Sequence, residues 1–169
     1  VSVYNLFASL LVLCGTCRLL EDGSSLAMLP RDDPISHVAA VPSILAIARL
    51  PGAVRHVQVG GEALTQPGVD NVRVGTTLHN YYGPTEAAIW ATRRTLSLDE
   101  AEQPRLASIG RPLPNVTCYI ADAETRELQP IGSWGELWLG GVQVARGYLH
   151  RPELTAEWFI ANPWPQTDP

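Results

Sequence analysis

A repeated pattern, in which a strand-like segment ends in glycine, constrains the fold more than any other feature of the sequence. Residues 54–59 (VRHVQV) alternate apolar and polar side chains, as in a half-buried strand, and two glycines follow at 60–61. Residues 77–81 (TLHNY) form a second short segment of this kind, which a Gly-Pro pair at 83–84 closes. Ligands of parallel α/β sheets bind at the carboxyl ends of the strands, so we expect a site beside these glycines.

The segments around these strands predict a chain in two parts. Residues 43–50 are expected to form a helix and residues 18–20 a short strand, and strands that alternate with helices indicate an α/β fold with a parallel sheet. After an acidic linker at 96–105, the strands expected at 117–121 and 136–139 are separated by glycines, which suggests an antiparallel β unit. A short helix is expected to open at Pro152.

The charged residues exclude several functions. All twelve basic residues are arginine, so the chain can supply neither a lysine nucleophile nor the lysine of a phosphate-binding P-loop. The net charge is −5 and no run of basic residues occurs, which argues against a nucleic-acid partner.

The cysteines and the apolar N-terminal segment indicate a cytoplasmic protein without a membrane partner. The cysteine count is odd, three, and no secretory signal is evident, which points to a reducing compartment. The apolar stretch at 6–14 is shorter than the roughly 20 residues that a membrane span requires, so we expect a buried helix over 3–13. The four histidines show no metal-ligand spacing, and we expect them in surface or packing positions.

The residues at 80–86 (NYYGPTE) carry groups suited to a nucleotide. The Asn80 amide matches the donor and acceptor pattern of a purine edge, and the Tyr82 ring offers a face on which a base can stack. The Thr85 hydroxyl can bind a phosphate oxygen, and the Glu86 carboxylate can bind Mg²⁺ beside phosphates. All these residue types are common in turns, so the residues alone favour an ordinary strand-to-helix turn over a nucleotide site.

Five blocks together resemble the amino-acid adenylation domains of nonribosomal peptide synthetases, within the acyl-adenylate-forming, AMP-binding superfamily. The 80–86 segment is similar to the family motif NxYGPTE, and four other blocks surround it in family order. They are GGEAL at 60–64, IGRPL at 109–113, GELWLGGVQVARGYL at 135–149 and RPELTAEWF at 151–159. The resemblance covers essentially the whole chain. It implies a flavodoxin-like parallel-sheet subdomain over 1–95, with the substrate and adenine pocket, followed over 96–169 by part of an antiparallel β-barrel subdomain.

The resemblance also implies a role for each site residue. Thr85 would touch the α-phosphate of ATP and Glu86 would bind Mg²⁺, which makes these two the catalytic residues, and the Gly83 carbonyl would help to hold the substrate ammonium. The ATP would be bound by Gly61, Asn80, Tyr82, Gly83 and Thr85, with the adenine among the first three. The pocket for the amino-acid side chain would be lined by Val1, Tyr4, Ala39, Gln58, Gly60, Tyr81, Ile89 and Trp90. The 135–149 block is mainly structural in the family, so we assign no catalytic residue to it.

The implied reaction converts an amino acid and ATP into an aminoacyl-adenylate, for loading onto the phosphopantetheine thiol of a peptidyl carrier protein. The bulk of Tyr4, Tyr81 and Trp90 favours a small substrate: glycine first, then alanine or cysteine. The chain lacks the family's ammonium-binding acidic residue, its phosphate loop and its catalytic lysine. We therefore expect an internal fragment that is inactive alone.

Two alternatives remain at this point. One is a fatty or aryl acyl-CoA ligase of the same superfamily, although Asn80 and the GGEAL block favour the amino-acid branch. The other is a non-catalytic binding module, such as a carbohydrate binder that uses the five tryptophans. The tryptophans are scattered along the sequence rather than grouped as a stacking platform.

Overall fold

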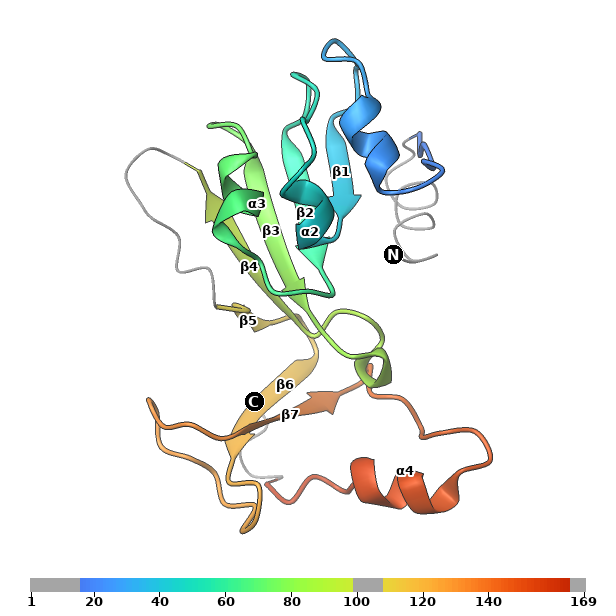
Figure 1. Ribbon diagram of the computed structural model, residues 1–169. Coiled ribbons are helices and arrows are strands. Elements are labelled where there is room, and N and C mark those ends of the chain that lie inside the picture. Colours follow the sequence, from blue (N-terminus) through green and yellow to red (C-terminus); the bar gives the residue numbers. More distant parts are fainter. Residues whose placement is uncertain (1–15, 99–107, 165–169) are drawn as a thin grey trace. The chain divides into compact units, whose positions relative to one another are not determined.

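The computed structural model describes residues 16–98 and 108–164, which divide into two compact units (Figure 1). Of the described residues, one unit contains 16–81, 93–98 and 108–110, and the other contains 82–92 and 111–164. The helix expected at 3–13 and most of the linker expected at 96–105 lie outside the described residues.

The first unit is built on a sheet whose first three strands are parallel. A 3₁₀ helix, η2 (Ser24–Met28), precedes β1 (His37–Ala40), β2 (His56–Gly60) and β3 (Thr77–Tyr82). The strand β4 (Thr92–Ser97) follows β3 in the order of the sheet. Both β1 with β2 and β2 with β3 pair in parallel, which confirms the predicted α/β class.

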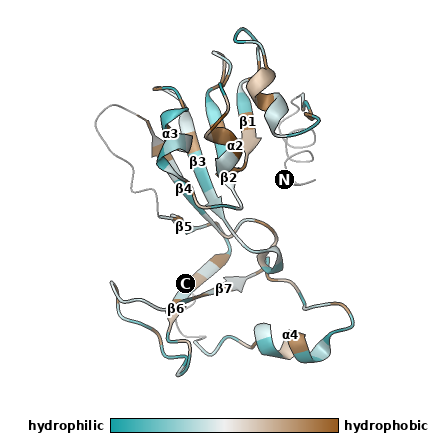
Figure 2. Ribbon diagram, viewed as in Figure 1, coloured by the Kyte–Doolittle hydropathy of each residue, from teal (hydrophilic) through white to brown (hydrophobic). Residues whose placement is uncertain are grey.

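Two short helices, α2 (Pro42–Leu45) and α3 (Gln66–Asp70), contribute to the same hydrophobic core as the sheet. The helix α2 is among the more hydrophobic segments of the chain, brown in Figure 2. Because alternate residues of a strand face opposite sides, one side of each strand enters the core. The buried core includes Val38, Leu45, Val57, Val69 and Leu78.

The helix predicted at 43–50 is shorter than expected and ends at Leu45. The side-chain amide of Asn71 donates to the carbonyl of Leu45 at 3.1 Å and also to that of Ala46. A longer helix would need these carbonyls for its own hydrogen bonds. Asn71, which lies outside the helix, occupies them and so terminates it.

The other end of α2 is also held from a distance. The Ser43 backbone N–H donates to Glu62 Oε2 at 3.0 Å, so the glutamate of the GGEAL block caps the first turn of the helix. A carboxylate at a helix N-terminus satisfies a free N–H group and interacts favourably with the helix dipole.

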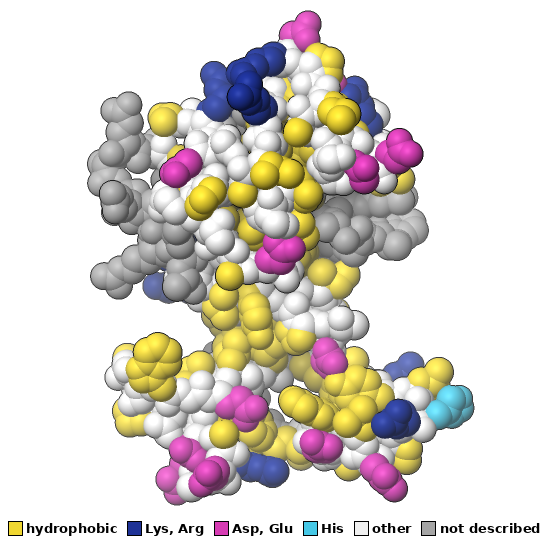
Figure 3. Space-filling model, viewed as in Figure 1, with side chains coloured by type: hydrophobic (Ala, Val, Ile, Leu, Met, Phe, Trp, Pro, Cys, Tyr) yellow, Lys and Arg dark blue, Asp and Glu magenta, His cyan; other side chains and the backbone are white. Residues whose placement is uncertain are grey.

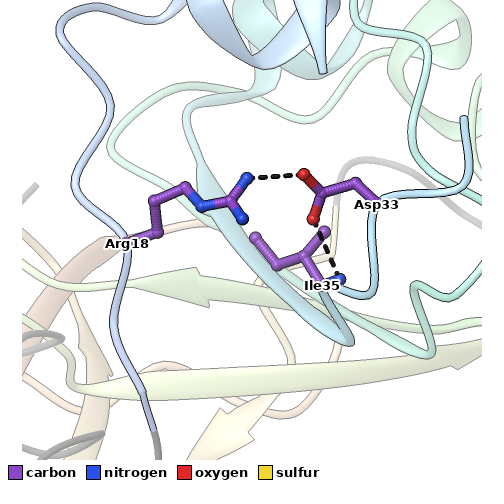
Figure 4. Close-up of polar contacts among 3 residues, drawn as sticks. All are labelled: Arg18, Asp33 and Ile35. Carbon is purple, nitrogen blue, oxygen red and sulfur yellow. Dashed lines mark hydrogen bonds and ion pairs between the residues drawn. The ribbon is translucent and has the colours of Figure 1, made fainter. Parts of the chain in front are cut away.

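The prediction of a strand at 18–20 is wrong, because these residues do not pair with any strand of the sheet. Leu19 is 74% exposed, and Arg18 reaches across to Asp33, with Nη1 2.5 Å from Oδ2 (Figure 4). The other Asp33 oxygen accepts the backbone N–H of Ile35 at 3.2 Å. The segment is therefore fixed by an ion pair rather than by strand pairing.

The second unit is built on an antiparallel pair, β6 (Val116–Ala121) and β7 (Glu136–Gly141), as the sequence predicted. It also contains the short strand β5 (Arg111–Pro112) and the helix α4 (Pro152–Trp158), which begins at the proline expected to open it. A small core joins the strands to the segment after β3, and it contains Ala87, Ala91, Leu113, Val116, Cys118 and Leu139. Among the described helices, none is long and apolar enough to cross a membrane.

Candidate functional site

The carboxyl ends of β2 and β3 lie side by side in the first unit. Gly60, the last residue of β2, is the register partner of Tyr81 and is buried. Gly61 follows with a φ of +87°, and no atom lies within 4 Å of the position that a Cβ would take. Glycine adopts this left-handed conformation without strain, and its backbone borders open space into which a ligand can approach.

Three residues predicted to line the amino-acid pocket share one face of the sheet. Ala39 and Gln58 are cross-strand neighbours, and Gln58 is in turn the register partner of His79. Tyr81 lies two residues beyond His79 on β3 and therefore points to the same side. This face is opposite the hydrophobic core, because the intervening residues Val57 and Leu78 are fully buried.

The same face carries a row of stacked histidines that was not expected from the sequence. The His37 and His56 rings stack with centroids 4.7 Å apart, and those of His56 and His79 are 6.0 Å apart and nearly parallel. Burial and neighbouring positive groups lower the pKa of His37 and that of His79, which favours the neutral form of both rings. The strand alternation alone could have placed these residues on one face with Gln58 and Tyr81.

Asn80 lies on the opposite side of β3 from Tyr81 and is 5% exposed. Its amide Nδ2 donates to the Ser108 carbonyl at 3.3 Å. Any contact of Asn80 with adenine would therefore use the remaining hydrogen-bonding groups of the amide.

The loop after β3 belongs to the second unit and closes tightly on itself. The Ala91 N–H donates to the Tyr82 carbonyl at 2.8 Å, which joins the two ends of the loop. A Cβ on Gly83 would lie 2.5 Å from the Ile89 carbonyl oxygen and 2.6 Å from the Ala91 nitrogen. Only glycine fits there without a shift of the backbone, while the Tyr82 side chain remains 39% exposed.

The far side of this loop has an unusual backbone. Ala88 has a φ of +50° and Ile89 a φ of +81°, a region that a β-branched residue rarely adopts. The Trp90 carbonyl accepts a hydrogen bond of 3.0 Å from Gln143 Nε2, so the second half of the unit holds the loop in this form. Strained backbone of this kind is common at ligand sites, and Ile89 and Trp90 are two of the predicted pocket residues.

Thr85 and Glu86 lie in a short 3₁₀ helix, η3 (Thr85–Ala87), within the same loop. The Thr85 side chain is exposed, and the half-buried Glu86 accepts a short hydrogen bond from the Tyr148 hydroxyl at Oε1. This hydrogen bond is the main reason why the pKa of Glu86 is lowered, and it raises the pKa of Tyr148. The glutamate is therefore ionised at neutral pH.

Sequence reasoning missed the contact of Tyr148 with Glu86, because the 135–149 block was assigned a structural role only. The Ala145 N–H also donates to the Glu86 backbone carbonyl, at 2.8 Å. A tyrosine 62 residues away gives no local signal of such a contact.

The predicted site residues are thus distributed over both units. Those from Ala39 to Tyr81 lie in the first unit, and those from Tyr82 to Trp90 lie in the second. Val1 and Tyr4 lie outside the described residues.

The residues of the second unit fit a magnesium ion that is bound together with a nucleotide. Glu86 offers an ionised carboxylate, which accepts the Tyr148 hydroxyl at Oε1 and also interacts with its own backbone N–H. No group of three or more His, Cys, Asp or Glu residues that could hold a metal by themselves is found in the part of the chain described. One carboxylate supplemented by substrate phosphates is the usual arrangement for Mg²⁺, whereas a metal cage made only of protein ligands is not.

Several arginines of the first unit lie away from the carboxyl ends of the strands, although Arg93 is close enough to His79 to lower the pKa of that histidine. On the face shown in Figure 3, arginines gather at the end where the strands begin. Arg55 and Arg73 each donate to the Gly52 carbonyl at 2.9 Å, so backbone contacts occupy them. The described arginines at this end therefore do not neutralise charge at the carboxyl ends of the strands.

Comparison with known proteins gives consistent matches. A family model described as AMP-binding enzyme matches residues 9–149. A linear gramicidin synthase of Brevibacillus parabrevis is 42% identical over 177 residues, covering 99% of this chain and 2% of that protein. AMB antimetabolite synthetase AmbB of Pseudomonas aeruginosa is 42% identical over 169 residues, covering 96% of this chain and 13% of its own length. Phosphinothricin tripeptide synthetase PhsB of Streptomyces viridochromogenes is 42% identical over 157 residues, covering 87% of this chain and 12% of that protein. The chain thus spans a small part of these relatives.

Proposed function

The chain belongs to the AMP-binding enzyme family, and on that premise we propose that it is part of an enzyme that activates an amino acid with ATP. The observation that carries the proposal is the Glu86 carboxylate, which follows the Gly-Pro turn at the end of β3 and is held by the Tyr148 hydroxyl. An ionised, oriented carboxylate at the carboxyl end of a parallel strand is suited to bind the metal of a nucleotide.

In the proposed reaction an oxygen of the amino-acid carboxylate attacks the α-phosphorus of ATP. The bond from this phosphorus to the bridging oxygen of the β-phosphate breaks, and pyrophosphate leaves with the electron pair. Positioning and charge neutralisation provide most of the acceleration in phosphoryl-type transfers. Bound Mg²⁺ would supply the neutralisation at the phosphate oxygens.

The residues of the chain would divide this work between them. Glu86 would hold the Mg²⁺, and the exposed Thr85 hydroxyl would bind the α-phosphate. The exposed Tyr82 ring is available for stacking on adenine, and the family resemblance assigns Gly61 to the same base. Asn80 would contribute to the recognition of adenine, and the Gly83 carbonyl to that of the substrate ammonium.

The side-chain pocket is proposed to take a small amino acid. The family resemblance assigns Gln58, Tyr81, Ile89 and Trp90 to its lining. Gly60 and Ala39 complete the proposed lining from the described residues. The bulk of Tyr81 and Trp90 supports glycine, alanine or cysteine rather than an aromatic substrate.

The activated amino acid would then pass to the phosphopantetheine thiol of a peptidyl carrier protein. The names of the relatives, which include a linear gramicidin synthase and a tripeptide synthetase, support a role in peptide synthesis. A chain without lysine lacks the residue that the family resemblance assigns to catalysis, so these 169 residues should be inactive alone.

The test is amino-acid-dependent exchange of labelled pyrophosphate into ATP by the complete adenylation domain that contains this chain. We expect exchange with glycine, alanine or cysteine, and a loss of at least about 100-fold in the Glu86→Gln variant, as for other electrostatic groups in active sites. The matched control is Glu124→Gln, an exposed residue of the β6–β7 connection, which should leave exchange unchanged.

Three outcomes would contradict parts of the proposal. Exchange that depends on a fatty or aryl acid but on no amino acid would identify an acyl-CoA ligase instead. Activation of tryptophan but not glycine would exclude the small pocket. Exchange by the 169-residue chain alone, at the rate of the complete domain, would show that no lysine is required.

A further inference from the structure

The segment 143–148 contacts the loop after β3 at three points, all within the second unit. Gln143 Nε2 donates to the Trp90 carbonyl at 3.0 Å, and the Ala145 N–H donates to the Glu86 carbonyl at 2.8 Å. The Tyr148 hydroxyl makes the third contact, with Oε1 of the Glu86 side chain. Two contacts fix the backbone of the loop, and the third fixes the orientation of one carboxylate.

Tyr148 is itself held by α4. Its backbone N–H donates to Thr155 Oγ1 at 2.9 Å, and its ring packs edge-on against Phe159 with centroids 5.3 Å apart. A Cβ on Gly147 would lie 2.3 Å from the Thr155 side chain, so the backbone before the tyrosine lies tightly against the helix. The hydroxyl therefore reaches Glu86 from a supported position.

We propose that Tyr148 is a positioning residue whose hydroxyl, on Oε1, orients the Glu86 carboxylate to hold Mg²⁺. The inference rests on the proposed function, because it takes Glu86 as the magnesium ligand. It assigns a functional role to a block that the sequence presents as structural. Partners that hold a metal ligand from behind commonly change metal affinity by about 10- to 100-fold when removed.

A purely structural role for Tyr148 makes a different prediction. Tyr148→Phe keeps the ring and its packing on Phe159 and removes only the hydroxyl. If the tyrosine served packing alone, this variant would retain the metal affinity. If it orients Glu86, the affinity falls while the fold is kept.

The experiment uses the complete adenylation domain and measures its binding of Mn²⁺ with a non-hydrolysable ATP analogue, by electron paramagnetic resonance. We expect Tyr148→Phe to weaken binding about 10-fold or more, and to raise the KM for Mg²⁺ in pyrophosphate exchange with little change in the KM for the amino acid. The matched control is Tyr119→Phe, which removes a hydroxyl that accepts a hydrogen bond from Asn162 within the same unit.

A double-mutant cycle with Glu86→Gln isolates the pair. If Tyr148 acts through the glutamate, its hydroxyl has no further effect on Mn²⁺ binding once the carboxylate is removed. Equal effects of Tyr148→Phe in the wild-type and Glu86→Gln backgrounds would overturn the inference. Should Tyr148→Phe fail to fold by circular dichroism, Thr155→Val, which releases the tyrosine backbone, is expected to weaken Mn²⁺ binding in the same way, and unchanged binding would overturn the inference.

Failure of this inference is distinguishable from failure of the proposed function. A wild-type domain without amino-acid-dependent exchange would contradict the proposed function itself. A wild-type domain that exchanges, together with a Tyr148→Phe variant of unchanged Mn²⁺ and Mg²⁺ dependence, would overturn the role of Tyr148 alone.

Discussion

Single residues of the loop after β3 decide the shape of the candidate site. Gly83 allows the backbone of residues 89–91 to approach, and Ile89 adopts a left-handed conformation that its own side chain disfavours. The motif predicts a glycine at this position, but it gives no indication of which atoms the glycine accommodates. The tertiary structure answers that question, since the nearest atoms are backbone and cannot rotate away.

Gly83→Ala should therefore disrupt the loop. The added methyl would meet the Ile89 carbonyl oxygen at 2.5 Å, which requires a backbone shift and a cost on the order of 1–3 kcal/mol in the free energy of unfolding. Pyrophosphate exchange should fall with it. Chemical denaturation and the exchange assay measure the two effects.

The control for this variant is Gly68→Ala within α3. There the nearest atoms to an added Cβ are at ordinary contact distance, the closest being the Pro42 carbonyl at 3.5 Å. Alanine is also the better helix former, so stability should be unchanged or slightly raised. Equal destabilisation by both substitutions would contradict the steric account of Gly83.

The ion pair of Arg18 with Asp33 should make stability depend on pH. The hydrogen bond from Arg18 is the main cause of the lowered pKa of Asp33, so the unfolded chain binds the proton more tightly than the folded one. The stabilisation is present above the unfolded pKa of about 3.9 and is lost as the pH falls through the lower folded value. Asp33→Asn should reduce the free energy of unfolding at pH 7. It should also make that free energy fall less steeply as the pH is lowered.

Urea unfolding between pH 2 and pH 7 measures this effect. Asp32→Asn removes a carboxylate from the exposed neighbouring residue and serves as the control. If the free energy of unfolding falls with acid pH in the same way for Asp33→Asn and for the wild-type protein, the ion pair does not contribute to stability.

At the level of elements, the prediction succeeded where a local pattern defines the element. The alternation at 54–59 became β2, the segment at 77–81 became β3, and the strands expected at 117–121 and 136–139 became β6 and β7. It was wrong at 18–20, where an apolar pair beside an arginine looked like a strand. An ion pair, which depends on the position of Asp33, holds that segment instead.

The short helix α2 depends on side chains from outside it, and Asn71 is its C-terminal support. Asn71→Ala would leave the Leu45 and Ala46 carbonyls without this partner in a partly buried place, which should cost about 1–3 kcal/mol in the free energy of unfolding. Thermal and urea unfolding measure the change.

Gln66→Ala is the matched control for this asparagine. It removes an amide that donates to Asp70 at 2.7 Å on the exposed surface of α3, so its effect should stay within about 0.5 kcal/mol. An effect of Asn71→Ala as small as that of the control would show that α2 ends at Leu45 for another reason.

At the scale of the whole chain, the units do not follow a single cut in the sequence. The sequence predicts one boundary near residue 95, and this boundary remains a prediction. Residues 82–92 cluster with 111–164 among the described residues, whereas 93–98 cluster with the first unit. The cause is the small core of the second unit, in which Ala87 and Ala91 pack with Val116. The composition of the sequence does not change at residue 82 or residue 93, so it does not indicate that 82–92 cluster with the second unit.

The sequence by itself determined two of the parallel strands, β2 and β3, together with the antiparallel pair, the helix after Pro152 and the positions of the motif residues. It could do so because strand alternation, prolines and glycines act on neighbouring residues. Only the tertiary structure decided that Glu62 and Asn71 hold α2, that Gln143 supports the Trp90 carbonyl and that Tyr148 reaches Glu86. These contacts join residues that are 19 to 62 positions apart, and no local pattern encodes a partner at such a distance.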